Sequence, residues 1–288
     1  MADVMQKIAT LDRRWVFLAI AVVVTVPFFV PMGLDIEPTE KTRQAFEAVN
    51  SLKGTGKPLM ISMDYGPETM AELQPMADTV IMQAFHQDIP VIGMTFIATG
   101  VGLAEQALNE SARRFEEQTG RKKEYGKDFV FLGFKPYAFA PITQIGENFA
   151  KAYPTDFRGT KKEDLEILRN VHTYADIGLV MDIAGNSMPA TWISYAVGRY
   201  DARFTMGVTA VMAADYYPYV QSGQSEGIVG GMRGAAEYEV MALEAGFFQS
   251  LGAGSRGMDS QSWTHIVIIL FIIVGNVAYF ASRRKDQG

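Results

Sequence analysis

Three aspartates stand at or near the carboxyl ends of apolar segments that we expect to be strands, namely Asp64, Asp182 and Asp215. The carboxyl ends of parallel strands share one edge of a sheet, and ligands bind beyond that edge. Carboxylate oxygens are the ligands that Mg²⁺ and Ca²⁺ prefer. The three aspartates are therefore our candidates for a divalent-cation site and for catalytic acids, with helix capping as the structural alternative.

The turn after the central apolar segment supplies two further candidates, Asn186 for ligand binding and Ser187 as a nucleophile. The local sequence G-N-S-M-P does not match the G-x-S-x-G turn that presents a catalytic serine in hydrolases. The chain has only three histidines, which are scattered along it, so we expect no zinc site.

A second candidate turn reads T-G-V-G and includes Thr99, Gly100 and Gly102. Backbone N–H groups at the start of a helix bind phosphate or carboxylate, so these residues are candidates for binding a small anion together with Asn186. The third glycine of a dinucleotide-binding fingerprint is missing, which argues against a nucleotide cofactor.

Four glycines near the end of the central region are spaced as two G-x-x-x-G pairs, Gly227 with Gly231 and Gly230 with Gly234. On a helix this spacing places both glycines of a pair on one face, where another backbone can approach closely. We therefore predict a contact surface here, with either another subunit or an element of the same chain.

The elements that must position these residues follow one repeated order: an apolar run, a glycine or polar turn, and a helix-compatible segment. The predicted strands are Pro58–Asp64, Pro90–Ile97, Phe129–Phe134, the apolar run leading to Asp182, and Phe204–Met212. The predicted helices include Glu68–Gln87, interrupted at Pro75, Leu103–Gln118, Thr160–Tyr174 and Pro189–Tyr200. Alternating strands and helices predict an α/β fold, a Rossmann-like three-layer sandwich with a mainly parallel sheet.

Two uncharged apolar segments, Trp15–Gly33 and Trp263–Ala281, flank this region. Each has 19 residues, close to the roughly 20 that a helix needs to cross a bilayer, so we predict an N-terminal and a C-terminal transmembrane helix. Basic residues precede the first segment and follow the second. The positive-inside rule then places both termini in the cytoplasm and the central domain outside the cell membrane.

These predictions divide the chain into seven parts. They are a cytoplasmic N-terminus (1–14), a first transmembrane helix (15–33), a stalk or linker helix (34–57), the α/β domain (58–220), a glycine-rich helical segment (221–262), a second transmembrane helix (263–281) and a basic cytoplasmic tail (282–288).

Charge separates the ends of the chain from its centre. The two ends together hold 6 of the 26 Lys and Arg residues but only 3 of the 32 Asp and Glu residues, so the segment between them is acidic. An acidic surface argues against nucleic acid as a partner, because binding to phosphates needs a basic surface. The chain has no cysteine, which excludes disulfides and thiolate metal sites.

Because no catalytic motif is complete, we expect a non-catalytic function. The favoured hypothesis is a membrane-anchored extracytoplasmic module that serves as a scaffold subunit of a homo-oligomer, or of an assembly with other membrane proteins. One alternative is a hydrolase that uses a divalent cation held by the three aspartates. A second alternative is a sensor of a small anionic ligand. We predict no cofactor apart from that possible cation, and the lipid bilayer as a partner.

Overall fold

The computed structural model describes residues 12–30 and 36–285. The chain divides into two compact units, one formed by residues 36–255 and one that combines the two ends of the chain.

The central unit is built on one sheet of six strands, all paired in parallel, in the order β3-β2-β1-β4-β5-β6. The strands are β1 (Leu59–Asp64), β2 (Val91–Thr95), β3 (Phe129–Phe134), β4 (Leu179–Ala184), β5 (Phe204–Val208) and β6 (Ile228–Gly230). The chain runs outward from β1 to β3 and then returns to place β4 beside β1. This is the strand order of a Rossmann fold, so the predicted α/β class is confirmed.

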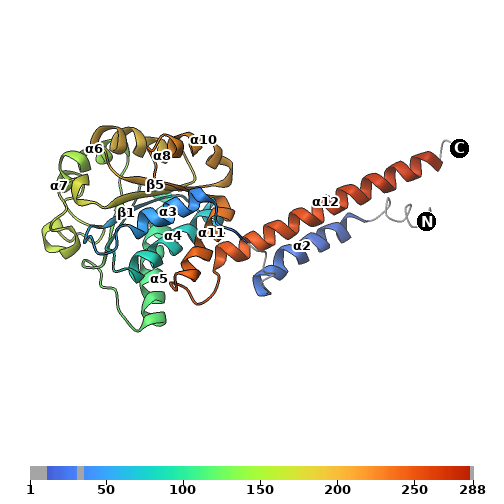
Figure 1. The fold of residues 1–288 in the computed structure, drawn as a ribbon, viewed down its shortest axis with the longest axis horizontal. Coiled ribbons are helices and arrows are strands. Elements are labelled where there is room, and N and C mark those ends of the chain that lie inside the picture. The colour runs from blue at the N-terminus through green and yellow to red at the C-terminus, as the bar shows by residue number, and fades with distance from the viewer. Residues whose placement is uncertain (1–11, 31–35, 286–288) are drawn as a thin grey trace. The chain divides into compact units, whose positions relative to one another are not determined.

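Helices cover both faces of this sheet (Figure 1). One face carries α3 (Glu40–Asn50), α4 (Met70–His86), α5 (Val101–Thr119) and α11 (Gly231–Glu244), and the other carries α6 (Phe139–Glu147), α7 (Phe149–Ala152), α8 (Met188–Trp192) and α10 (Ala210–Gln221). Side chains alternate along β1, so Ile61 and Met63 join the first core while Met60 joins the second. Burial on both faces explains why the strands are continuous apolar runs in the sequence.

Local signals account for several boundaries. In α5, Ala104, Leu108 and Phe115 lie on the buried face, as the helical spacing predicts. The helix ends at Gly120, whose φ of 71° is left-handed and allows its N–H to bond back to Glu116 O. Glycine adopts this conformation without the steric cost that other residues would incur.

The central unit is larger than the predicted α/β domain. The predicted stalk contains α3, whose Ala45 and Val49 are fully buried in the core. At the other end, the glycine-rich segment supplies the sixth strand and α11. A strand of three residues that ends in glycine is too short to produce an alternating pattern, which is why the sequence did not reveal it.

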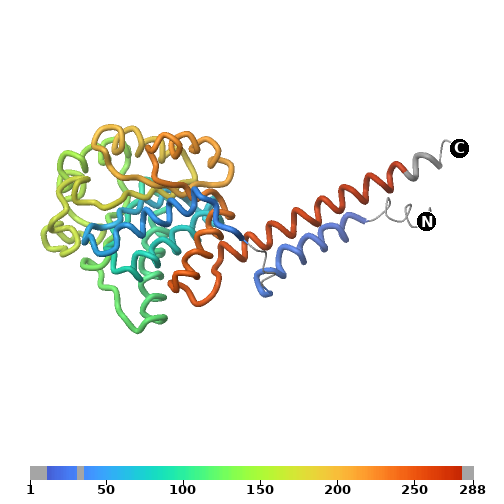
Figure 2. The backbone as a smooth tube through the Cα atoms, viewed as in Figure 1, coloured from blue at the N-terminus to red at the C-terminus, as the bar shows by residue number. Residues whose placement is uncertain are grey.

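Three predicted elements differ in form. Helix α4 is continuous through Pro75, because a proline near the start of a helix displaces only one early hydrogen bond. The fifth strand ends at Val208, and α10 begins at Ala210. The predicted helix Thr160–Tyr174 is instead three short 3₁₀ turns, η2 (Lys162–Asp164), η3 (Glu166–Leu168) and η4 (Tyr174–Asp176), in the irregular connection between β3 and β4 that Figure 2 traces.

The connection replaces that helix because its backbone is tied to its surroundings. Asp156 accepts hydrogen bonds from the N–H of Arg158 and of Thr160, and Lys162 N–H donates to Pro154 O. Further along, the Ile167 N–H donates to Gly126 O and not to the carbonyl four residues earlier that it would bond in a helix. Leu165 and Leu168 are nevertheless buried, so the apolar spacing identified core residues while the helix itself was wrong.

The other unit contains α2 (Arg13–Phe29) and, from Arg256 onward, α12 (Ala253–Lys285). Within the described residues, one helix is long and apolar enough to cross a membrane, Ala253–Phe280 of α12, with a mean hydropathy of 2.0. Helix α2 has 17 residues and begins with two arginines, so its apolar part is shorter than a bilayer core. Ser260 Oγ donates to Val24 O at 2.8 Å, which joins α12 to the C-terminal half of α2.

Candidate functional site

Two of the candidate aspartates, Asp64 and Asp182, lie on neighbouring central strands. Asp64 ends β1, and Asp182 on β4 is paired in register with Ser62, two residues earlier on β1. The side chains of Ser62, Asp64 and Asp182 point to the face covered by α6, α8 and α10. Met63 and Ile183 alternate with them and point to the opposite face. The chain reverses its direction of winding between β1 and β4, which is where Rossmann-like proteins bind ligands.

The carboxylate of Asp64 is well supplied with donors. Ser62 Oγ donates to its Oδ2 at 2.6 Å, and the N–H of Phe96 donates to its Oδ1. Thr95 Oγ1 makes a longer bond of 3.3 Å to Oδ1. Burial raises the pKa of Asp64, and these donors act in the opposite direction by favouring the charged form.

Asp182 has the opposite environment. It is fully buried, and neither carboxyl oxygen has a hydrogen-bond donor among the described residues. Burial, and next the charge of Asp64, raise the pKa of Asp182 far above its ordinary value. When Asp182 is protonated, its hydroxyl can donate to the carboxylate of Asp64. Asp182 then needs no donor of its own to compensate a buried charge. The pair is therefore best described as two carboxyl groups that share one proton.

The loops above this pair close over it. A Cβ on Gly100 would lie 2.5 Å from Tyr65 O, and one on Gly185 would lie 2.5 Å from Thr69 Oγ1. Asn186 Nδ2 donates to Asp64 O at 2.8 Å, and Asn186 Oδ1 accepts from Met188 N–H. Asn186 and Gly100 thus hold the loops together. With Asp64 and Asp182 both 0% exposed, no substrate reaches their carboxyl groups in this conformation.

The third aspartate does not join the pair. Asp215 is exposed in the second turn of α10, because β5 ends at Val208 and not at the predicted Met212. In the part of the chain that the structure describes, no group of three His, Asp or Glu residues is close enough to hold a metal ion. The three-carboxylate cation site is therefore not formed.

Ser187, Thr99 and Gly102 belong to the turns that follow β4 and β2, at the same edge of the sheet as Asp64. Ser187 is exposed at the start of α8. Among the described residues, its hydroxyl has no hydrogen bond to a side chain that could act as a base. Thr99 is exposed in the short turn η1 (Ala98–Gly100), and Gly102 is exposed in the first turn of α5 with open space around it. The anion-binding prediction for this turn stays a prediction.

The four glycines do not form one helical face. Gly230 ends β6, and Gly231, with a φ of 62°, begins α11, so neither G-x-x-x-G pair lies within a single helix. Their close neighbours belong to the same chain. A Cβ on Gly227 would lie 2.2 Å from Ala45 N in α3, and one on Gly231 would lie 2.5 Å from the Cβ of Ala210 in α10. The glycines serve internal packing, the second of the two expected roles.

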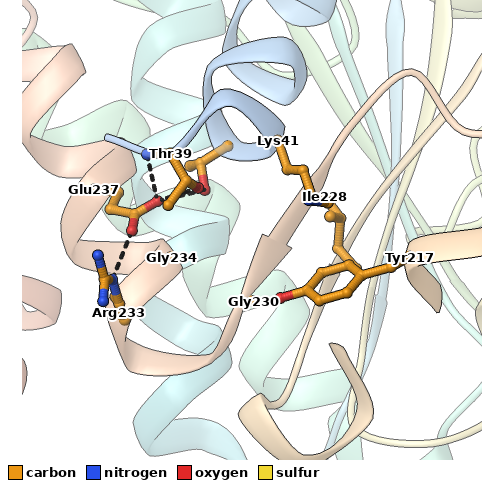
Figure 3. A pocket seen from close by; sticks show the side chains of 9 residues that line it. Thr39, Lys41, Tyr217, Ile228, Gly230, Arg233, Gly234 and Glu237 are labelled. Atoms are coloured by element: carbon orange, nitrogen blue, oxygen red, sulfur yellow. Dashed lines mark hydrogen bonds and ion pairs between the residues drawn. The ribbon is translucent and has the colours of Figure 1, made fainter. Parts of the chain in front are cut away.

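A pocket of about 280 Å³ opens beside β6, between α3, α10 and α11 (Figure 3). Glu237 and Arg233 line one side, and Lys41 and Tyr217 line the other. The Lys41 ammonium lies 4.7 Å from the centre of the Tyr217 ring. Glu237 is buried and accepts from Thr39 N–H, Thr39 Oγ1, Thr42 Oγ1 and Arg233 Nε.

Three exposed aromatic side chains lie within six residues of one another, at the end of β3 and in the segment that follows it. We call Phe134, Tyr137 and Phe139 the aromatic patch; they are 37%, 78% and 53% exposed. Tyr137 has a φ of 56°, a left-handed conformation that is rare for a bulky residue and often marks a functional position. The ring of Phe139 lies 6.2 Å from that of Tyr195, which extends the patch.

The pocket was not foreseen from the sequence, because Thr39 and Glu237 are 198 residues apart and neither belongs to a motif. The aromatic patch had a partial signal in the cluster of aromatic residues that follows the third predicted strand.

Comparisons with known proteins add little to this description. No protein-family model matches the chain, and no curated protein matches its sequence significantly. A solved structure described as "Trehalose-6-phosphate synthase. OtsA" is similar to 88% of this chain and 50% of that one, with a TM-score of 0.33 and 12% identity. This chain thus spans half the length of that structure. A likeness at this level establishes no shared activity.

Proposed function

We propose that this chain is a membrane-anchored α/β module that acts as a scaffold subunit, through contacts with further copies of itself or with other membrane proteins. The complete burial of Asp64 and Asp182 carries this proposal. They are the carboxyl groups at the position where the fold would bind a substrate, and a catalytic acid or base must come within hydrogen-bond reach of the reacting atoms. Among the described residues, neither Asp215 nor Ser187 has a hydrogen bond to Asp64 or Asp182, so they do not complete a catalytic set.

The aromatic patch supports a role in assembly. Exposed apolar patches on a soluble surface commonly mark contacts with other proteins, and Tyr residues are enriched at such contacts. Covering Tyr137 and Phe139 would remove both rings from water. Tyr137 combines a left-handed backbone with a side chain that is 78% exposed, so a partner could reach its ring.

Two membrane helices with both termini in the cytoplasm complete the proposal. Helix α12 supplies one span, and the apolar sequence that begins at Trp15 and continues to Gly33 supplies the second. The bond between Ser260 and Val24 supports an antiparallel pair, because it joins the beginning of α12 to the end of α2. Basic residues flank both spans on the terminal side, which favours an extracytoplasmic central unit.

The mass of the full chain extracted in mild detergent tests this proposal. Light scattering should give a protein mass above the 31.8 kDa of one chain. The double variant Tyr137→Ser with Phe139→Ser should return a lower mass than the wild type, because it removes both rings from the contact. Val211→Ser is the matched control, since Val211 is 87% exposed and lies in the first turn of α10, outside the aromatic patch. A single-chain mass for the wild type in detergent and in native membranes would contradict the scaffold role.

A further inference from the structure

We propose that the pocket beside β6 binds a small oxyanion of the phosphate class, either as a free ion or as the phosphate of a lipid headgroup. The proposal concerns a binding site and does not depend on assembly of the chain. It also concerns a different place from the turn at Thr99, since the pocket lies between α3, α10 and α11.

Two cationic side chains, Lys41 and Arg233, line this pocket together with one carboxylate, Glu237. Among the described residues, no carboxylate lies within 4.0 Å of the Lys41 ammonium, whose neighbour is the Tyr217 ring. Arg233 uses Nε to bond to Glu237 at 2.9 Å, and the described residues offer no partner to its two terminal nitrogens. Its side chain is 65% exposed. Three donor nitrogens, Lys41 Nζ and the two terminal nitrogens of Arg233, are thus available to a ligand.

The carboxylate in the pocket offsets one of these two positive charges. Glu237 is 2% exposed, and its two oxygens accept from Arg233 on one side and from Thr39 and Thr42 on the other. These bonds fix Glu237 as a structural link between α11 and α3. One negative and two positive groups leave the pocket with a formal charge of +1 in a central region whose overall charge is negative.

The size and shape of the pocket limit the ligand. Pockets for drug-sized molecules begin at about 300 Å³, so a pocket of about 280 Å³ suits a small anion better than a nucleotide. Gly230 and Gly234, at the junction of β6 and α11, also line the pocket. Phosphate accepts charge-assisted hydrogen bonds from both guanidinium and ammonium groups.

The test uses the full chain in detergent and measures binding of inorganic phosphate by calorimetry at constant ionic strength. We expect saturable binding that Lys41→Gln and Arg233→Gln each weaken by roughly tenfold or more, because each removes a charge-assisted bond. Arg233→Lys should retain part of the affinity, which separates loss of charge from loss of the Glu237 bond. Lys53→Gln is the matched control, since Lys53 is exposed after the end of α3 and outside the pocket.

The same variants in nanodiscs distinguish the two sources of phosphate. Native mass spectrometry that retains phosphatidylglycerol on the wild type, but not on Lys41→Gln, would assign the pocket to a lipid headgroup. Phosphate binding without such lipid retention would assign it to a free ion. The proposal is overturned if the folded wild type shows neither, or if all variants, including Lys53→Gln, bind phosphate and lipid equally.

Discussion

Asp64 and Asp182 are neighbours on the two central strands, and only one of them has hydrogen-bond donors. Ser62, Thr95 and Phe96 donate to Asp64, whereas both oxygens of the fully buried Asp182 lack a donor among the described residues. This asymmetry makes Asp64 the member that holds the charge and Asp182 the member that holds the proton. A buried proton at this position has measurable consequences for stability.

Asp182→Asn should stabilise the chain increasingly as pH rises. In the unfolded chain an aspartate loses its proton near pH 4, whereas native Asp182 keeps it well above that pH. The native state therefore binds more protons, and its free energy of unfolding falls by about 1.4 kcal/mol per pH unit across this window. Asparagine has no proton to lose and can still donate to Asp64.

Thermal midpoints of the full chain in detergent between pH 5 and pH 8 measure this effect. The midpoint of Asp182→Asn minus that of the wild type should grow with pH. Asp164→Asn is the control, because Asp164 is exposed and should leave the slope unchanged. Parallel pH profiles for Asp182→Asn and the wild type would show that Asp182 is ionised when folded.

Asp78 should produce a similar effect over a narrower range. Burial raises its pKa to about 6, although Gln74 donates to it and Arg114 lies 3.7 Å away. Its raised pKa lowers the free energy of unfolding between about pH 4 and pH 6, with no further change above that range. Asp78→Asn should therefore remove a slope that ends near pH 6, which separates it from Asp182. Persistence of the full wild-type slope in Asp78→Asn would refute this assignment.

Gly227→Ala should destabilise the central unit, by about 1–3 kcal/mol. Its new Cβ would lie 2.2 Å from Ala45 N, and a helix backbone cannot move aside as a flexible side chain can. Gly102→Ala is the matched control, because no atom lies within 4 Å of its Cβ in α5. That variant should be stabilised by roughly 0.5–1 kcal/mol, since alanine favours helix. Chemical denaturation in detergent checks both, and equal stabilities would contradict the close contact between Gly227 and α3.

Sequence reasoning succeeded where burial is simple. Strands buried on both faces read as apolar runs, so β1 and β3 were placed within one residue of their observed bounds. The expected parallel sheet placed Asp64 and Asp182 at one edge, whereas their adjacency depends on the strand order, which the sequence did not predict. The predicted fifth strand was too long because the apolar residues continue into α10, and this error placed Asp215 at a strand end.

Long-range contacts could not be read in this way. The sequence around Thr39 does not indicate that Thr39 donates a hydrogen bond to Glu237. The sequence around Gly227 does not indicate that Ala45 lies against it. In the 160–174 segment, hydrogen bonds to residues outside it, such as that from Ile167 N–H to Gly126 O, outweighed a good helical pattern. Such choices depend on tertiary partners, which periodicity and local propensity do not contain.

Labelling of a single cysteine at the aromatic patch tests the scaffold role most directly. The chain has no cysteine, so Tyr137→Cys carries the only thiol. In membranes of the organism that produces the chain, a water-soluble maleimide should modify Tyr137→Cys much more slowly than Glu116→Cys on the exposed face of α5, and dissociation of the assembly should remove the difference. Equal labelling of both variants in intact membranes would contradict a covered patch and, with it, the proposed scaffold function.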